Sequence, residues 1–250
     1  MTPEEFFAAH PRAALAFSGG ADSAYLLWAG LHCGADIRPY YVRTAFQPRF
    51  ELDDARRLCA QLGAALTVLD CDILSVPHVA ENPCDRCYHC KTALFSRLAA
   101  QARQDGYPLL LDGTNASDDA GDRPGMRALR ELSVRSPLRE CGLTKAEIRA
   151  RSREAGLFTW DKPANACLAT RIPAGETITA EALRITESAE DTLRGLGFTD
   201  FRVRLLRGCA RIQLPETQLP LLLQHRQEIL QALRRDYSAV LLDLEVRSEQ

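Results

Sequence analysis

Short apolar runs alternate with amphipathic stretches over the first two-thirds of the chain. Residues 13–18 predict a strand, and residues 21–32 predict a helix that follows it directly. In residues 51–62 apolar side chains recur at helical spacing on one face. The other elements predicted here are strands over 37–42, 66–69 and 108–111 and helices over 88–103 and 145–155. Short apolar strands separated by helices indicate an α/β fold, a doubly wound parallel sheet covered on both faces.

The pattern changes between residues 163 and 175, where Pro163, Pro173 and Gly175 interrupt it. The elements predicted after this stretch are a helix over 179–196, strands over 201–206 and 210–214, a helix over 216–234 and a strand over 239–246. This α-β-β-α-β order predicts a smaller α+β domain. We therefore expect two domains, at residues 1–165 and 175–250.

The first predicted strand delivers a Ser-Gly-Gly-x-Asp-Ser turn that opens the first predicted helix. Its residues are Ser18, Gly19, Gly20, Asp22 and Ser23. The glycines allow close backbone approach, and the serines and the first helical amides offer hydrogen-bond donors to an anion. The turn lacks the Gly-Lys-Ser/Thr ending of a Walker loop. It resembles the phosphate-binding loop of the PP-loop ATP pyrophosphatases, with their adenine nucleotide alpha hydrolase-like fold.

Polar residues also follow the strand predicted over 108–111. Asp112, Gly113, Thr114 and Asn115 suit contacts to a nucleotide, and a solvated loop explains them equally well. Asp122 and Arg123 follow, where an arginine can hold a phosphate or simply lie in a surface turn.

Bulk properties narrow the function classes. The formal net charge of −2 provides no overall field for nucleic acid, and no apolar stretch reaches membrane-spanning length. The N-terminal residues lack the basic and apolar regions of a secretion signal. We therefore expect a cytoplasmic protein that binds neither nucleic acid nor a membrane, and whose nine cysteines are not a disulfide framework.

Two cysteine sites stand out from the others. Cys84, Cys87 and Cys90 form two overlapping Cys-x-x-Cys steps. They suit a zinc site with His89 or His78 as fourth ligand, or an iron–sulfur cluster, and a chance cluster at a helix start remains open. The second site is Cys167, which lies among small residues between Lys162 and Arg171, whose charges can lower the pKa of its thiol. Taken alone, these residues favour a buried cysteine in a linker over a reactive thiol.

Several blocks in order resemble the LarE family, the ATP-dependent sacrificial sulfur transferases of nickel-pincer nucleotide cofactor biosynthesis. The blocks, which span roughly the whole chain, are 18–23, Asn82-Pro83 with Arg86-Cys87-Tyr88-His89-Cys90-Lys91, Asp112-Gly113-Thr114-Asn115, Asp122-Arg123-Pro124-Gly125, Ser136-Pro137-Leu138, Ala166-Cys167-Leu168-Ala169-Thr170-Arg171-Ile172-Pro173, Phe201-Arg202-Val203-Arg204 and Ala210-Arg211-Ile212. The glycine turn alone specifies only the PP-loop superfamily, whereas the cysteine blocks are much more specific.

The resemblance implies that ATP binds with Mg²⁺ on the glycine turn and adenylylates a carboxylate of a pyridinium dicarboxylate mononucleotide. Cys167 matches the sulfur-donating cysteine and would leave dehydroalanine after forming a thiocarboxylate. Arg202 and Arg204, which alternate along one predicted strand, and Arg211 on the next would bind the substrate phosphate in the second domain, unless they form only a solvated basic face. The resemblance also implies a homo-oligomer.

Three alternatives stay open. In the first, Cys87, Cys90 and Cys167 hold a [4Fe-4S] cluster that carries the transferable sulfide, a scheme with no place for Cys84. In the second, the chain is another PP-loop adenylylating enzyme, for tRNA thiolation or amidation. In the third, it is a non-catalytic nucleotide-binding module with a structural zinc.

Overall fold

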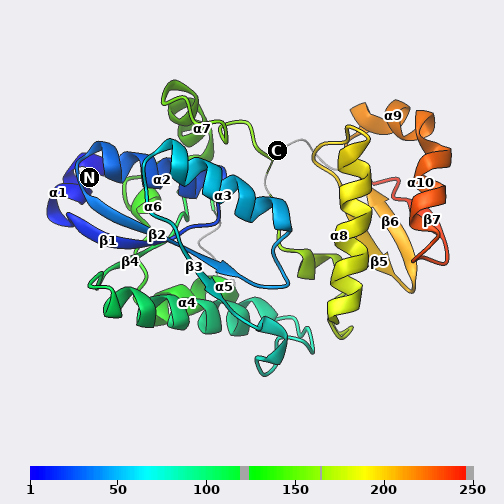
Figure 1. Cartoon of the computed structure of the whole chain (residues 1–250), viewed down its shortest axis with the longest axis horizontal. Coiled ribbons are helices and arrows are strands. Elements are labelled where there is room, and N and C mark those ends of the chain that lie inside the picture. The colour runs from blue at the N-terminus through cyan, green and yellow to red at the C-terminus, as the bar shows by residue number, and fades with distance from the viewer. Residues whose placement is uncertain (119–123, 164, 246–250) are drawn as a thin grey trace. The chain divides into compact units, whose positions relative to one another are not determined.

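The computed structural model describes residues 1–118, 124–163 and 165–245, and these fall into two compact units (Figure 1). The N-terminal unit comprises residues 1–44, 49–76 and 85–162. The C-terminal unit comprises residues 45–48 and 77–84 together with the chain from Pro163 onward. Among the described residues, no helix is both long and apolar enough to cross a membrane.

A four-stranded parallel sheet in the order β3-β2-β1-β4 forms the centre of the N-terminal unit. The strands are β1 (Arg12–Ala16), β2 (Asp36–Arg43), β3 (Thr67–Asp70) and β4 (Leu110–Leu111). This order confirms the predicted doubly wound α/β class. The strand order reverses direction at β1, so the crevice beyond the carboxyl ends of β1 and β4 is the expected ligand position.

Helices cover both faces of this sheet (Figure 1). Ala13 and Leu15 of β1 pack into one core with side chains from α1, α2, α3, α6 and α7, whereas Ala14 packs into the opposite core with Leu98 and Ala102 of α4. Alternation along the strand thus fills two apolar layers. The helices of this unit are α1 (Pro3–Ala9), α2 (Ala21–His32), α3 (Arg49–Gln61), α4 (Arg86–Gln104), α5 (Pro124–Glu131), α6 (Pro137–Glu140) and α7 (Lys145–Glu154), with a 3₁₀ turn η1 (Ile73–Ser75).

The C-terminal unit has its own mixed sheet and its own core. Strand β6 pairs antiparallel with β5 and parallel with β7. The elements are η2 (Leu168–Arg171), α8 (Ala180–Gly195), β5 (Arg202–Leu206), β6 (Cys209–Gln213), η3 (Glu216–Gln218), α9 (Leu219–Gln224), α10 (Arg226–Leu233) and β7 (Val240–Leu242). Leu193, Val203, Ile212 and Leu233 meet in the core, which confirms the expected smaller C-terminal fold.

One predicted element of this unit is wrong. The single helix expected over residues 216–234 is a 3₁₀ turn followed by two short helices, α9 and α10. Pro220 lies in the first turn of α9. Because proline lacks an amide hydrogen, it begins a helix there and cannot continue one from residue 216.

Candidate functional site

The glycine turn connects β1 to α2 in a fixed conformation. The backbone of Gly19 has φ +71°, and a Cβ there would lie 3.2 Å from Ala55 of α3, so glycine alone fits. The hydroxyl oxygens of Ser18 and Ser23 lie 3.1 Å apart, and the Gly20 amide donates to the Ser18 hydroxyl over 3.3 Å. In the described structure no side chain caps α2 at Gly20, which leaves the first amides of the helix to an anionic ligand.

The end of β4 lies directly against the start of α2. A Cβ on Gly113 would lie 3.0 Å from the Ser23 amide nitrogen. The Asp112 carboxylate is buried and accepts hydrogen bonds from the hydroxyls of Ser136, at 2.6 Å, and Thr114. The glycine turn and the end of β4, which are about ninety residues apart in the sequence, thus lie against each other at the carboxyl edge of the sheet. Ligands of doubly wound sheets bind at this position.

A cavity of about 240 Å³ lies between these two segments. Because whole small-molecule pockets usually exceed about 300 Å³, this volume suits the phosphate end of a nucleotide. Of the predicted ATP residues, Gly19 and Asn115 are absent from the lining: Gly19 packs on α3, and the buried Asn115 side chain accepts from the Ser117 amide at 2.8 Å. The lining residues are Ala16, Ser18, Gly20, Asp22, Ser23, Phe95, Asp112, Gly113, Thr114 and Asp118.

Three carboxylates line this cavity, those of Asp22, Asp112 and Asp118. Burial raises the pKa of Asp22, and the nearby Asp118 carboxylate raises it further, against a lowering hydrogen bond from Asn115. The buried Oδ1 of Asp22 has no hydrogen-bond partner among the described residues. An uncompensated carboxylate oxygen lining a cavity fits a hard divalent cation such as Mg²⁺, which takes its other ligands from nucleotide phosphates and water.

Lys162 is a contact of the glycine turn that the sequence does not reveal. Its ammonium nitrogen lies 2.6 Å from the Asp54 carboxylate on α3 and 3.4 Å from the Gly19 carbonyl oxygen. The sequence predicts that Lys162 lowers the pKa of the Cys167 thiol. In the structure the Lys162 ammonium pairs with Asp54 and contacts the glycine turn, and no local signal in the sequence marks a contact across 143 residues.

The cysteines of the first motif lie in different units. Near the start of α4, Cys87 is exposed and Cys90 is half-buried, at a spacing that places the two thiols on one helix face. Cys84 and Cys167 belong to the C-terminal unit. His89 contacts Asp85 at 3.4 Å and His78 contacts Glu81 at 3.2 Å. No cluster of three or more metal-ligating side chains occurs within the described ranges, and the predicted cluster of Cys87, Cys90 and Cys167 stays a prediction.

Cys167 lies at the start of the 3₁₀ turn η2, and the peptide group that follows it is held by hydrogen bonds. The Cys167 carbonyl accepts hydrogen bonds from the Thr170 amide, at 3.0 Å, and the Thr170 hydroxyl, at 2.8 Å. The next amide, of Leu168, donates to the Phe46 carbonyl at 2.8 Å. The small residues around Cys167 thus lie in a segment whose backbone is held by hydrogen bonds.

The three predicted phosphate-binding arginines differ in environment. Arg202 is 4% exposed, so a solvated basic face does not describe it. Arg204 donates to the Thr170 carbonyl and to the Gln213 side chain, both at 2.5 Å. Arg211 lies 3.5 Å from Asp243. Their role in binding a substrate phosphate stays a prediction, and the predicted contacts Asp122 and Arg123 lie outside the described residues.

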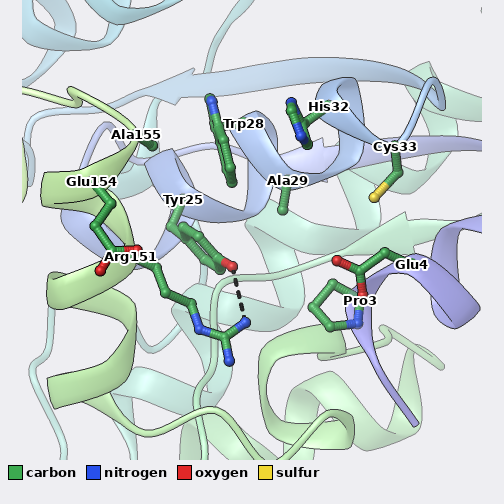
Figure 2. A pocket seen from close by; sticks show the side chains of 10 residues that line it. All are labelled: Pro3, Glu4, Tyr25, Trp28, Ala29, His32, Cys33, Arg151, Glu154 and Ala155. Carbon is green, nitrogen blue, oxygen red and sulfur yellow. Dashed lines mark hydrogen bonds between the residues drawn. The ribbon is translucent and has the colours of Figure 1, made fainter.

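A larger cavity, of about 370 Å³, lies on the N-terminal unit away from the glycine turn (Figure 2). The Arg151 guanidinium points toward the Tyr25 hydroxyl, 3.5 Å away, and the Trp28 ring stacks on His32 (Figure 2). None of the predicted site residues lines it. Of these two cavities, the smaller one is lined by both the glycine turn and the end of β4.

The sheet order, the glycine turn and its carboxylate-lined cavity define a doubly wound α/β protein with a candidate phosphate-binding cavity at the switch point. No family model matches the chain. It is 36% identical over 210 residues to the pyridinium-3,5-bisthiocarboxylic acid mononucleotide synthase of Lactiplantibacillus plantarum. The aligned region covers 83% of this chain and 76% of that protein. It is also 37% identical to an uncharacterized protein of Synechocystis, over 96% of this chain and 91% of that one. The chain therefore belongs to the family of pyridinium-3,5-bisthiocarboxylic acid mononucleotide synthases, the LarE family.

Proposed function

We propose that this protein is an ATP-dependent sulfur transferase that converts a carboxylate of a pyridinium dicarboxylate mononucleotide to a thiocarboxylate, for a nickel-pincer cofactor. Membership of the synthase family supports the substrate class. The observation that carries the proposal is the cavity at the β1–β4 switch point, where hydrogen-bond donors and an uncompensated carboxylate oxygen lie together.

ATP binds with its phosphates in this cavity. The hydroxyls of Ser18 and Ser23 and the first amides of α2 donate to phosphate oxygens, and the positive end of the α2 dipole favours the negative charge. The Lys162 ammonium, which is paired with Asp54, donates to the Gly19 carbonyl and so supports the conformation of the turn. Asp22 would provide a carboxylate ligand to Mg²⁺, which would also bind phosphate oxygens and offset their charge.

Adenylylation comes first because a carboxylate oxygen is a poor leaving group. The substrate carboxylate attacks the α-phosphorus of ATP, pyrophosphate leaves, and an acyl-adenylate forms. The Cys167 thiolate then displaces AMP and forms a thioester. Loss of the Cys167 Cα proton to a base and cleavage of its Cβ–S bond release the thiocarboxylate and leave dehydroalanine in the chain.

The connectivity of the chain supports the attack of the Cys167 thiolate on the acyl-adenylate. Lys162, which contacts the glycine turn, precedes Cys167 by five residues. Because five residues span at most about 18 Å when fully extended, the covalent chain tethers the thiol to the turn.

The test is intact-protein mass after incubation with ATP, Mg²⁺ and pyridinium dicarboxylate mononucleotide, with pyrophosphate measured in parallel. We expect one pyrophosphate per activated carboxylate and a mass loss of about 34 Da, the loss of H₂S from one cysteine. Cys167→Ser is expected to release pyrophosphate without that loss, whereas Cys209→Ser, at a half-buried cysteine on β6, is expected to behave as the natural protein does.

Each of the other outcomes would favour one of the three alternative functions. Thiocarboxylate formed at unchanged protein mass would favour a cluster on Cys87, Cys90 and Cys167, and iron with acid-labile sulfide in anaerobically prepared protein would accompany it. Pyrophosphate release that needs tRNA or an amine donor would favour another adenylylating reaction. Nucleotide binding with no pyrophosphate release would favour a binding module.

A further inference from the structure

One buried arginine donates hydrogen bonds to residues on both sides of Cys167, to a main-chain carbonyl before it and to a side-chain hydroxyl after it. Arg171 is 2% exposed, and its Nη1 donates to the Ala166 carbonyl at 3.2 Å and to the Thr170 hydroxyl at 2.8 Å. Ala166 precedes the cysteine directly. The Thr170 hydroxyl, which accepts from Arg171, donates in turn to the Cys167 carbonyl. A single guanidinium thus contacts both ends of the segment that carries the thiol.

The orientation of that guanidinium is set by Glu190 on α8. The Glu190 carboxylate is 4% exposed and receives Nε of Arg171 at 2.6 Å and Nη2 at 3.2 Å, one nitrogen on each oxygen. Its Oε1 also accepts from the Val203 amide of β5 at 3.0 Å. A two-pronged pair of this kind fixes the guanidinium plane, and it leaves Nη1 directed at the cysteine segment.

Stability alone gives a weak reason for this pair. Two ions buried together lose their hydration, and apolar side chains of similar volume are often as stable in their place. The Arg171 charge is also paired with the Glu190 carboxylate at 2.6 Å. This pairing argues against a role for Arg171 in stabilising the thiolate form of Cys167. What remains specific to the pair is the geometry of the two hydrogen bonds from Nη1.

We propose that the Glu190–Arg171 pair is a positioning device that sets the direction from which the Cys167 sulfur approaches the activated carboxylate. Glu190 and Arg171 are positioning residues in this scheme, because they act through the main chain of residues 166–170. The inference rests on the proposed function for its catalytic consequence. Displacements of about 1 Å in a reacting group can slow a reaction about a hundredfold, so loss of the pair affects sulfur transfer far more than adenylylation.

The test uses a double variant that carries both Arg171→Met and Glu190→Gln. Methionine fills volume without a charge, and the glutamine oxygen can still accept from the Val203 amide. The matched control is Arg184→Met with Glu181→Gln, which removes an exposed arginine–glutamate pair from the same helix. Both are measured by pyrophosphate release, by the single-turnover rate of the 34 Da mass loss, by thermal unfolding and by the pH dependence of Cys167 alkylation.

In the Arg171→Met, Glu190→Gln variant we expect pyrophosphate release within about twofold of the natural protein and a mass-loss rate lower by about a hundredfold. The pH midpoint of alkylation is expected to stay unchanged. The control is expected to match the natural protein throughout. A folded double variant with an unchanged mass-loss rate, or one whose loss is explained by a shifted alkylation midpoint, would overturn the inference.

Arg171→Lys keeps the positive charge beside Glu190 but cannot make the fork, and it serves if the double variant does not fold. Sulfur transfer at the natural rate in Arg171→Lys would also overturn the inference. Hydrogen exchange of the amides of residues 166–170, expected to be faster in either variant, needs no activity. If the natural protein keeps its sulfur, the proposed function fails, and this exchange still decides whether the pair holds the segment.

Discussion

Asp22 is the residue at which function and stability conflict most clearly. A buried carboxylate with an unpartnered oxygen is costly, and burial followed by repulsion from Asp118 raises its pKa. The pKa of Asp22 is thus higher in the folded than in the unfolded protein. Protonation of Asp22 therefore stabilises the folded state, and this stabilisation is fully present below the unfolded pKa. That stabilisation is lost as pH rises through the folded pKa. At any pH above the folded pKa of Asp22, the apo protein therefore carries a destabilising charge there.

We predict that Asp22→Asn raises the thermal unfolding temperature of the apo protein at neutral pH and removes the extra stabilisation given by Mg²⁺ with ATP. The natural protein should also lose part of its ATP binding as pH falls toward the raised pKa of Asp22, because the neutral acid is a poor cation ligand. Unfolding temperatures measured across pH, with and without nucleotide, provide the check. Asp53→Asn, at an exposed carboxylate of α3, is the matched control. An Asp22→Asn protein that still gains stability from Mg²⁺ and ATP would contradict the assignment.

Residue types alone identified the glycine turn but not its surroundings. Ser18 to Ser23 could be read from the sequence because strand, turn and helix are contiguous there. The contacts of Lys162 with Asp54 and of Arg171 with Glu190 join different segments of the chain, and no periodicity specifies them. Arg171 in particular was expected to tune the Cys167 thiol by charge, whereas its charge is already paired in the core.

At the scale of elements, the site depends on how closely β4 approaches α2. The end of β4 contacts the first turn of α2 through Gly113, where any Cβ would lie 3.0 Å from the Ser23 amide nitrogen. That neighbour is backbone and cannot turn aside. A side chain at residue 113 must therefore push the strand end and the helix start apart, which widens the spacing of the donors that face the phosphates.

We predict that Gly113→Ala weakens ATP binding at least tenfold, equivalent to about 1.4 kcal/mol. Overpacking should also cost about 1–3 kcal/mol of stability. Gly195→Ala at the end of α8, where no atom lies within 4 Å of an added Cβ, is expected to change neither quantity appreciably. Calorimetric titration with ATP and thermal unfolding measure both. Equal ATP affinity in the Gly113→Ala variant and the natural protein would show that this contact does not shape the site.

Apolar periodicity predicted elements better than it predicted their interruptions. The helix over Ala21–His32 is confirmed to the residue, because a strong apolar pattern follows the glycine turn. The break at Pro220 was missed because the flanking leucines continue a helical pattern through it. Helix α1 was also missed, although Thr2 and Glu5 form a capping box that is visible in the sequence as Thr-x-x-Glu.

At the scale of the whole molecule, the two units have separate cores but an interwoven chain. Phe46 and Val79, both almost fully buried, belong to the C-terminal unit although the chain around them builds the N-terminal unit. Asn82, with φ +55°, donates from its side chain to the Pro173 carbonyl at 2.8 Å. The sequence could not show this exchange of segments, because a local change in composition marks a boundary only where the chain crosses it once.

Separate cores lead to a prediction about unfolding. Each unit buries its own apolar cluster, so thermal unfolding of the intact chain should show two transitions rather than one. Mg²⁺ with ATP at a hundredfold excess over its dissociation constant should stabilise the N-terminal transition by about 2.7 kcal/mol and leave the other nearly unchanged. Asn82→Ala should do the reverse: it removes a buried hydrogen bond and should destabilise only the nucleotide-insensitive transition, by about 1–3 kcal/mol.

Differential scanning calorimetry of the natural protein and the Asn82→Ala variant, each with and without Mg²⁺ and ATP, separates these effects. His78→Ala is the matched control, because His78 also has a positive φ but its side chain is exposed. A single transition that nucleotide and Asn82→Ala both shift would mean that the exchanged segments couple the two cores into one cooperative unit. Two transitions, each responding to one perturbation, would mean that the segments are held by the C-terminal core alone, as the bonds from Asn82 to Pro173 and from Leu168 to Phe46 indicate.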